Sequence, residues 1–158
     1  MNDSEIQHLR RCVELASEAL ESGDEPFGSL LVSGNGEVLF EDRNRVASGD
    51  RTRHPEFEIA RWAAANMTLE ARAAATVYTS GEHCPMCAAA HGWVGLDRIV
   101  YISSSDQLAT WLSALGVPAP PVRSLPIHEV VPNLTVEGPV PSLIEQVHKL
   151  HRRFHSSS

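Results

Sequence analysis

The sequence predicts an α/β fold: a three-layer α-β-α sandwich around a mixed five-stranded sheet. Stretches with apolar residues at helical spacing alternate with short β-prone runs along the chain. One helical stretch separates the last two β-prone runs, so these two strands should lie parallel and be joined by a right-handed crossover. The length of 158 residues suits a single domain. We place this domain at residues 1–155 and expect a disordered tail over residues 156–158.

Each expected element follows from the spacing of apolar residues and from the positions of Gly and Pro. The first helix ends at Gly23, and the Gly-Asn-Gly sequence at residues 34–36 makes the first two strands a hairpin. Pro55 and Pro85 each begin a helix, because proline is favoured at the first helical position, and Gly116 ends a later one. In chain order the expected elements are a helix over 4–22, strands over 28–33 and 37–41, a helix over 55–65, a strand over 76–80, a helix over 85–95, a strand over 98–102, a helix over 106–115, a strand over 127–131 and a helix over 142–154.

Charge and composition limit the partners and the compartment. The chain has 13 basic and 20 acidic side chains, a formal net charge of −7. Proteins contact the phosphate backbone of nucleic acids through clustered Lys and Arg, so the excess of acidic side chains disfavours a nucleic-acid partner. The Arg-rich loop over residues 42–53 means that such a partner is not excluded. No apolar run is long enough to cross a bilayer, and the N-terminal residues lack the apolar segment of a signal peptide. We therefore expect a cytoplasmic protein without a membrane partner.

Two short motifs carry the chemistry: H-P-E at residues 54–56 and C-P-M-C at residues 84–87. In a chain with three cysteines, the C-x-x-C spacing indicates metal or redox chemistry before structural disulfides. One imidazole and two thiolates make a three-ligand zinc set, which leaves the fourth tetrahedral position free for water. Cys84 falls at a helix start, where the partial positive charge favours a thiolate. Glu56 is not needed as a ligand and can move a proton between water and a departing amine.

These motifs resemble the H-x-E and P-C-x-x-C signature of the zinc-dependent deaminases of bases and nucleosides. The chain resembles the branch that contains guanine deaminase, cytosine deaminase and tRNA adenosine deaminase, over nearly its whole length. Three further segments carry the resemblance: residues 26–28 (PFG) before the first strand, residues 44–45 (NR) after the second, and residues 99–101 (IVY) in a later strand. The resemblance implies a cytidine deaminase-like fold, zinc as the cofactor and a homodimer. Trp62, Trp93 and Trp111 also favour a dimer, since they lie on expected helices that cannot all face one small core.

The resemblance also implies roles for individual residues. The implied site consists of His54, Cys84 and Cys87 as zinc ligands, Glu56 as the catalytic proton carrier, and Asn44, Phe27, Asp106 and His83 as substrate-binding residues. Some of these residues have a structural alternative: Asn44 suits a turn, Asp106 a helix N-cap and Phe27 a core position. His83 departs from the family pattern, because it stands where the family has proline before the first cysteine.

The expected function is the hydrolytic removal of an exocyclic amine from a free nucleobase or a related aminated heterocycle, of the guanine, cytosine or s-triazine type, with release of ammonia. The first alternative is a tRNA adenosine deaminase that forms inosine. The second is a zinc-binding module without catalysis. The low basicity argues against the first alternative, and the intact Glu56 argues against the second. The sequence does not name the ring.

Overall fold

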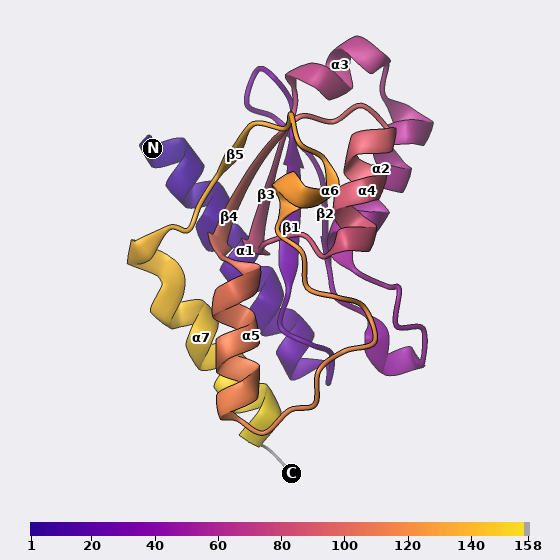
Figure 1. Cartoon of the computed structure of the whole chain (residues 1–158). Coiled ribbons are helices and arrows are strands. Elements are labelled where there is room, and N and C mark those ends of the chain that lie inside the picture. The colour runs from indigo at the N-terminus through magenta and orange to yellow at the C-terminus, as the bar shows by residue number, and fades with distance from the viewer. Residues whose placement is uncertain (157–158) are drawn as a thin grey trace.

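A five-stranded sheet forms the middle layer of the protein, and helices lie on both of its faces (Figure 1). The structure is a computed structural model that describes residues 1–156. The strands are β1 (Gly28–Val32), β2 (Val38–Arg43), β3 (Thr76–Gly81), β4 (Arg98–Ser103) and β5 (Val136–Glu137). The helices are α1 (Asp3–Glu21), α2 (Pro55–Asn66), α3 (Leu69–Ala74), α4 (Pro85–Trp93), α5 (Ser105–Ala114), α6 (Ile127–Val130) and α7 (Pro141–Ser156), with a short 3-10 helix at Val46–Ser48.

The sheet is mixed, in the order β2-β1-β3-β4-β5. Strand β1 pairs antiparallel with β2 and β3, whereas β3 with β4 and β4 with β5 are parallel pairs. The predicted mixed five-stranded sheet with two parallel last strands is therefore confirmed. Because β3 and β4 are parallel, their carboxyl ends meet at one edge of the sheet, which is where ligand sites form in α/β folds.

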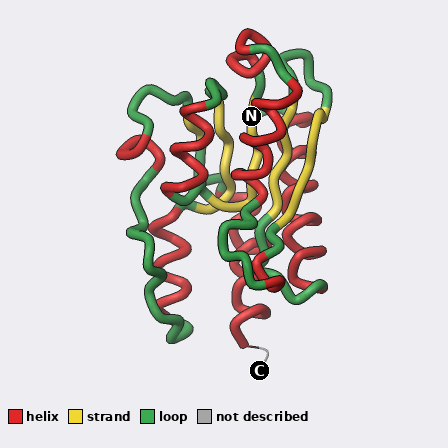
Figure 2. The backbone as a smooth tube through the Cα atoms, turned by 90° about the vertical axis from the view of Figure 1, so that its right-hand side faces the viewer, coloured by secondary structure: helices red, strands yellow, loops and turns green. Residues whose placement is uncertain are grey.

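Alternate residues of the central strands face two separate apolar cores, one on each side of the sheet. On one side, Leu30 of β1 and Tyr78 of β3 pack with α1 and α7. On the other side, Leu31 and Val77 pack with α2. Figure 2 shows the helices on both sides of the strands, so the expected three layers are confirmed. Among the described residues, no helix is both long enough and apolar enough to span a membrane.

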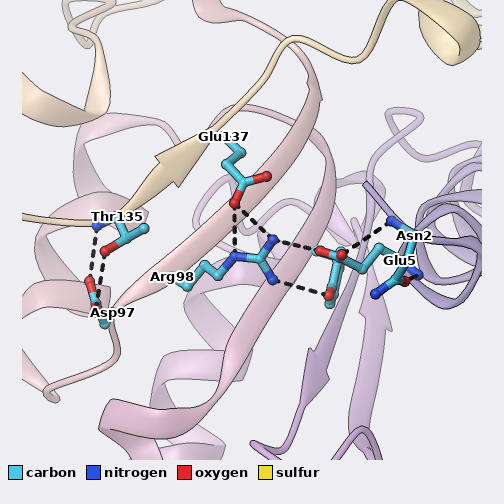
Figure 3. A network of polar contacts seen from close by, with 7 residues as sticks. Asn2, Glu5, Asp97, Arg98, Thr135 and Glu137 are labelled. Atoms are coloured by element: carbon cyan, nitrogen blue, oxygen red, sulfur yellow. Dashed lines mark hydrogen bonds and ion pairs between the residues drawn. The ribbon is translucent and has the colours of Figure 1, made fainter.

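Polar contacts hold the short strand β5 in the sheet (Figure 3). Arg98, the first residue of β4, donates to the carboxylates of Glu137 in β5 (2.8 Å) and Glu5 in α1 (2.5 Å). Just before the two strands, the Thr135 N–H donates to the Asp97 carboxylate at 2.9 Å. These contacts stabilise β5, which pairs with β4 over only two residues.

The prediction of a strand over residues 127–131 is wrong, because the helical turn α6 lies there and the fifth strand comes later, at β5. Ile127 and Val130 pack into one apolar cluster with Ile99. Residues three apart face the same side of a helix but opposite sides of a strand, so this shared burial favours the helical turn. The Glu82 carboxylate accepts the Ile127 N–H at 2.8 Å, which gives the start of the turn a hydrogen-bond partner.

Two smaller differences concern segments without an expected element. Helix α3 was not predicted, and the Thr68 side chain caps it by accepting the Ala71 N–H at 3.1 Å. Ser156, which we expected in the disordered tail, is the last residue of α7. Residues 157 and 158 of that expected tail lie outside the described residues.

Gly28 allows α1 to lie directly on β1. A Cβ at this position would come within 2.5 Å of the Cys12 carbonyl oxygen and of the Leu15 Cβ. Neither atom can turn away, so we expect Gly28→Ala to push α1 off the sheet and to lower the free energy of unfolding by about 1–3 kcal/mol. Urea denaturation of the zinc-loaded protein measures this effect.

The matched control is Gly34→Ala in the exposed turn between β1 and β2. There a Cβ would come no nearer than 3.1 Å to another atom, the Ala74 Cβ, and the two neighbours can separate slightly. The control should lose clearly less stability than Gly28→Ala. Equal losses would show that α1 and β1 are not in the close contact described.

Candidate active site

The site forms where α2 and α4 begin next to each other under the carboxyl end of β3. His54 is the N-cap of α2 and Cys84 is the N-cap of α4, and each precedes the proline that starts its helix. Cys87 lies in the first turn of α4. The Nδ1 atom of His54 is 3.5 Å from the Cys84 Sγ and 3.6 Å from the Cys87 Sγ. The two Sγ atoms are 3.5 Å apart.

These distances fit a zinc ion. With Zn–S bonds of about 2.3 Å and a Zn–N bond of about 2.0–2.1 Å, tetrahedral geometry separates two sulfur ligands by about 3.8 Å and sulfur from nitrogen by about 3.6 Å. Among residues 1–156, His54, Cys84 and Cys87 are the one group of His, Cys, Asp or Glu side chains placed to hold a metal ion. Three protein ligands leave one tetrahedral position for water or substrate, as in catalytic zinc sites.

The contacts within this group favour a thiolate at Cys84 and protons on His54 and Cys87. A hydrogen bond from the Cys87 thiol, and then the contact with His54, lower the pKa of Cys84 to about 4. The contact with Cys84 raises the pKa of His54 to about 9, although burial opposes this shift. The hydrogen bond with Cys84 and burial raise the pKa of Cys87 well above its ordinary value. Without metal, the group is therefore a thiolate–imidazolium pair with a neighbouring thiol.

Glu56 lies next to these three side chains, in the first turn of α2, and is only 5% exposed. One carboxylate oxygen, Oε1, accepts hydrogen bonds from the Ser29 Oγ (3.0 Å) and the Thr79 Oγ1 (2.8 Å). Burial raises the pKa of Glu56, and the nearby His54 opposes this shift. A carboxyl group whose pKa is raised suits a residue that takes up a proton and returns it.

Asn44 follows β2 directly and is 1% exposed. Its backbone N–H donates to the Phe27 carbonyl at 3.0 Å, and its side-chain oxygen accepts the Val46 N–H at 3.0 Å. The turn-forming alternative is thus present in the structure. It uses the side-chain oxygen and leaves the amide nitrogen for another acceptor, so the two roles of Asn44 are compatible.

Phe27 is half-buried, between the segment that carries Asn44 and the end of β3. Its ring lies 3.2 Å from the position that a Cβ on Gly81 would occupy. On its other side, the ring has an edge-on contact with His151 of α7, with 5.0 Å between the ring centres. Phe27 therefore links the C-terminal helix to the strand end that leads to Cys84.

Asp106 and His83 are not among these grouped side chains, although His83 directly precedes Cys84 in the chain. Asp106 is in the first turn of α5, whose N-cap is Ser104, and it lines a cavity of about 310 Å³ with Glu82 and Tyr101. None of the three candidate metal ligands and neither Glu56 nor Asn44 lines that cavity. The His83 ring is fully buried and lies edge-on to the His91 ring, with 5.2 Å between the ring centres. The substrate roles of both residues stay predictions.

Sequence reasoning missed Ser29 and Thr79. Both are 0% exposed and stand in strands whose other inward residues on that face are apolar. Buried hydroxyl groups need hydrogen-bond partners, so a Ser or Thr within such a strand signals a polar neighbour. The sequence contains this signal. The polar neighbour, Glu56, could be identified only once α2 was placed on the sheet.

Comparison with known proteins agrees with this geometry. Residues 2–103 match the zinc-binding region of cytidine and deoxycytidylate deaminases, which is more than half of the chain. The chain belongs to this family. Its expected fold, its zinc cofactor and its resemblance to the cytosine, guanine and tRNA adenosine deaminases are confirmed.

Three relatives illustrate the range of the family. The chain is 31% identical to a probable cytosine deaminase of Schizosaccharomyces pombe over 111 residues, which is 68% of this chain and 65% of that protein. It is 33% identical to the guanine deaminase of Bacillus subtilis over 103 residues, 64% of this chain and 65% of that protein. It is 31% identical to tRNA-specific adenosine deaminase 2 of Danio rerio over 124 residues, 73% of this chain and 58% of that protein. Each match spans less than two thirds of the relative.

Solved structures show the same fold. A protein solved in complex with 2,6-diaminopurine superposes with a TM-score of 0.76 at 20% identity, covering 100% of this chain and 84% of that chain. The structure of Bacillus subtilis guanine deaminase gives a TM-score of 0.58 at 27% identity, covering 84% of this chain and 91% of that chain.

Proposed function

We propose that this protein is a zinc-dependent hydrolase that removes an exocyclic amine from a free nucleobase or a related aminated heterocycle and releases ammonia. One observation carries the proposal: a three-ligand metal set with an open position lies beside Glu56, a buried carboxyl group that the set does not need as a ligand. Membership of the deaminase family supports the same reaction. Guanine, cytosine and s-triazine rings are the substrate types we put first.

Each residue of the site has its own role in this reaction. Zinc held by His54, Cys84 and Cys87 supplies Lewis acidity, which brings the pKa of water towards neutrality. Glu56 takes one proton from the attacking water and delivers it to a ring nitrogen, and then takes the proton of the added hydroxyl group and delivers it to the leaving amine, which leaves a carbonyl group on the ring. Asn44 donates its free amide N–H to the ring and orients it. Phe27 forms an apolar wall beside the ring.

Ion pairs within the chain favour a free ring over a base in tRNA. The loop beside Asn44 carries four arginines that could contact phosphates, yet each has a carboxylate partner in the chain. The pairs are Arg43–Asp24 (2.8 Å), Arg45–Asp42 (3.1 Å), Arg51–Glu25 (3.9 Å) and Arg53–Glu58 (3.5 Å). A phosphate-backbone footprint needs unneutralised cations, and the chain carries a formal net charge of −7. The tRNA adenosine deaminase alternative rests on the Danio rerio relative.

A direct competition tests the proposal. The zinc-loaded protein is offered guanine, cytosine, aminated s-triazines, their nucleosides where they exist, and tRNA transcripts, and ammonia release and inosine content are measured. We expect release of ammonia from at least one free ring. Inosine formation in tRNA without turnover of any free ring would support the alternative, and no turnover of any substrate would support the binding module.

Asn44→Ala should lower kcat/KM while leaving the zinc content unchanged. The ring would lose one donor in a buried site, which costs about 1–3 kcal/mol and corresponds to a decrease of roughly 5- to 150-fold. Asn44→Asp is the matched variant, because it keeps an acceptor for the Val46 N–H, while it replaces the amide donor by a carboxylate oxygen and adds a negative charge. Both variants should lose activity. Full activity of Asn44→Asp would assign Asn44 to the turn alone.

We expect the protein to form at least a dimer. Trp62 stacks on Phe40 and Trp111 on His148, so both are packed within the chain. Trp93, at the end of α4, is 90% exposed, and Leu69, whose side chain lies near Gly95, is 70% exposed. Large exposed apolar side chains on neighbouring segments suit a protein interface. Light scattering should give a mass of at least twice 17.3 kDa, and Trp93→Lys should lower it; a monomer at micromolar concentration would contradict the prediction.

A further inference from the structure

Two hydroxyl side chains lie opposite each other in the sheet, directly beneath Glu56. Ser29 of β1 and Thr79 of β3 are partners in the antiparallel register, so their side chains point to the same face. That face is the one covered by α2, whose first turn carries Glu56. Both hydroxyl residues are 0% exposed. Their hydroxyl groups therefore need hydrogen-bond partners within the protein.

The contacts bind one side of the carboxyl group and leave the other side for chemistry. Both hydroxyl groups lie within hydrogen-bond distance of the same oxygen, Oε1, at 3.0 Å from Ser29 and 2.8 Å from Thr79. His54, a member of the metal-binding group, is the N-cap of the helix whose first turn carries Glu56. The hydroxyl pair thus attaches Glu56 to two strands, while the carboxyl group still faces the metal-binding side chains.

The same pair has a second set of acceptors. The Ser29 Oγ is 2.8 Å from the Thr79 Oγ1, and the Thr79 Oγ1 is 3.0 Å from the Gly81 carbonyl oxygen. Each hydroxyl group carries one proton. Both protons can point to Oε1 when Glu56 is a carboxylate, and both can turn to the second set when Glu56 carries a proton. The two buried hydroxyl groups therefore have an acceptor whether Glu56 is ionised or protonated.

We propose that Ser29 and Thr79 are positioning residues, which fix Glu56 through Oε1 so that its carboxyl group stays aimed at the space beside His54, Cys84 and Cys87. This inference rests on the proposed function, because it concerns the proton carrier of that reaction. A helix residue held only by its own rotamer could swing away from this space. The two hydroxyl groups hold it from the rigid centre of the sheet, since β1 and β3 are both interior strands.

The test uses substitutions that remove hydroxyl groups but keep volume. Thr79→Val and Ser29→Ala should each lower kcat about 10-fold, and the double variant about 100-fold, because a misplacement of about 1 Å costs rates of that order. KM and zinc content should stay unchanged. Thr79→Ser keeps the hydroxyl group and should recover most of the kcat lost in Thr79→Val. Thr76→Val, on the same strand but outside the site, is the matched control and should leave kcat unchanged.

Crystal structures provide a measurement that does not depend on turnover. In the wild-type protein Glu56 should occupy one conformation, and in the double variant, or in Thr79→Val if the double variant does not fold, it should be displaced or spread over several. One unchanged conformation, or a kcat within twofold of wild type with zinc bound, would overturn the proposal. A wild-type protein that deaminates no ring would defeat the proposed function instead, and the conformation of Glu56 would still decide the positioning role.

Discussion

Glu56→Gln is expected to lower kcat by about 10²- to 10⁴-fold, the usual contribution of a general acid–base group. Glutamine has the size and shape of glutamate, and its side-chain oxygen can still accept the hydrogen bonds of Ser29 and Thr79. The variant therefore keeps the packing of the site and loses only the ability to carry a proton. Ammonia release with saturating substrate measures kcat, and elemental analysis should still find one zinc per chain.

Glu58→Gln is the matched control for this prediction. Glu58 lies on the same helix, two residues further on, and its carboxylate pairs with Arg53 at 3.5 Å. The same chemical change there should leave kcat near the wild-type value. A Glu56→Gln variant that folds, binds zinc and retains near-wild-type kcat would remove Glu56 from the reaction.

Local sequence was sufficient to predict the candidate metal group. His54 and Cys84 are both N-caps, and the proline after each one fixes the helix start that presents it. The C-x-x-C spacing then places Cys87 one turn later, on the same side of α4. The need for Gly28, by contrast, comes from the packing of α1 on β1 and became visible only in the structure.

Features that depend on distant partners could not be predicted in this way. Residues 127–131 have β-branched residues, but the Glu82 carboxylate and the apolar cluster around Ile99 make their first part helical. Asp106 follows a strand end in the expected way, yet it faces a cavity lined by none of the candidate metal ligands. Ser29 is a single polar residue in an apolar strand. Its hydrogen-bond partner, Glu56, lies 27 residues further along the chain, so the local sequence does not indicate it.

The zinc affinity is expected to fall about 100-fold for each unit decrease in pH between about pH 5 and 8. A metal ligand must lose its proton to bind, so each ligand that is protonated in the metal-free protein adds a factor of ten per unit. His54, with a pKa of about 9, is protonated in this range, and so is Cys87, whose pKa lies well above its ordinary value. Cys84, with a pKa of about 4, is already a thiolate and adds nothing.

Two protons should therefore leave the protein for each zinc ion bound at about pH 6. Calorimetric titration in buffers with different ionisation enthalpies counts these protons, and competition with a chelator across the pH range measures the slope of affinity. Turnover should disappear when the chelator removes zinc and return when zinc is added. A wild-type count of zero, with affinity independent of pH, would mean that the metal-free site is not the thiolate–imidazolium pair with a neutral Cys87 thiol described above.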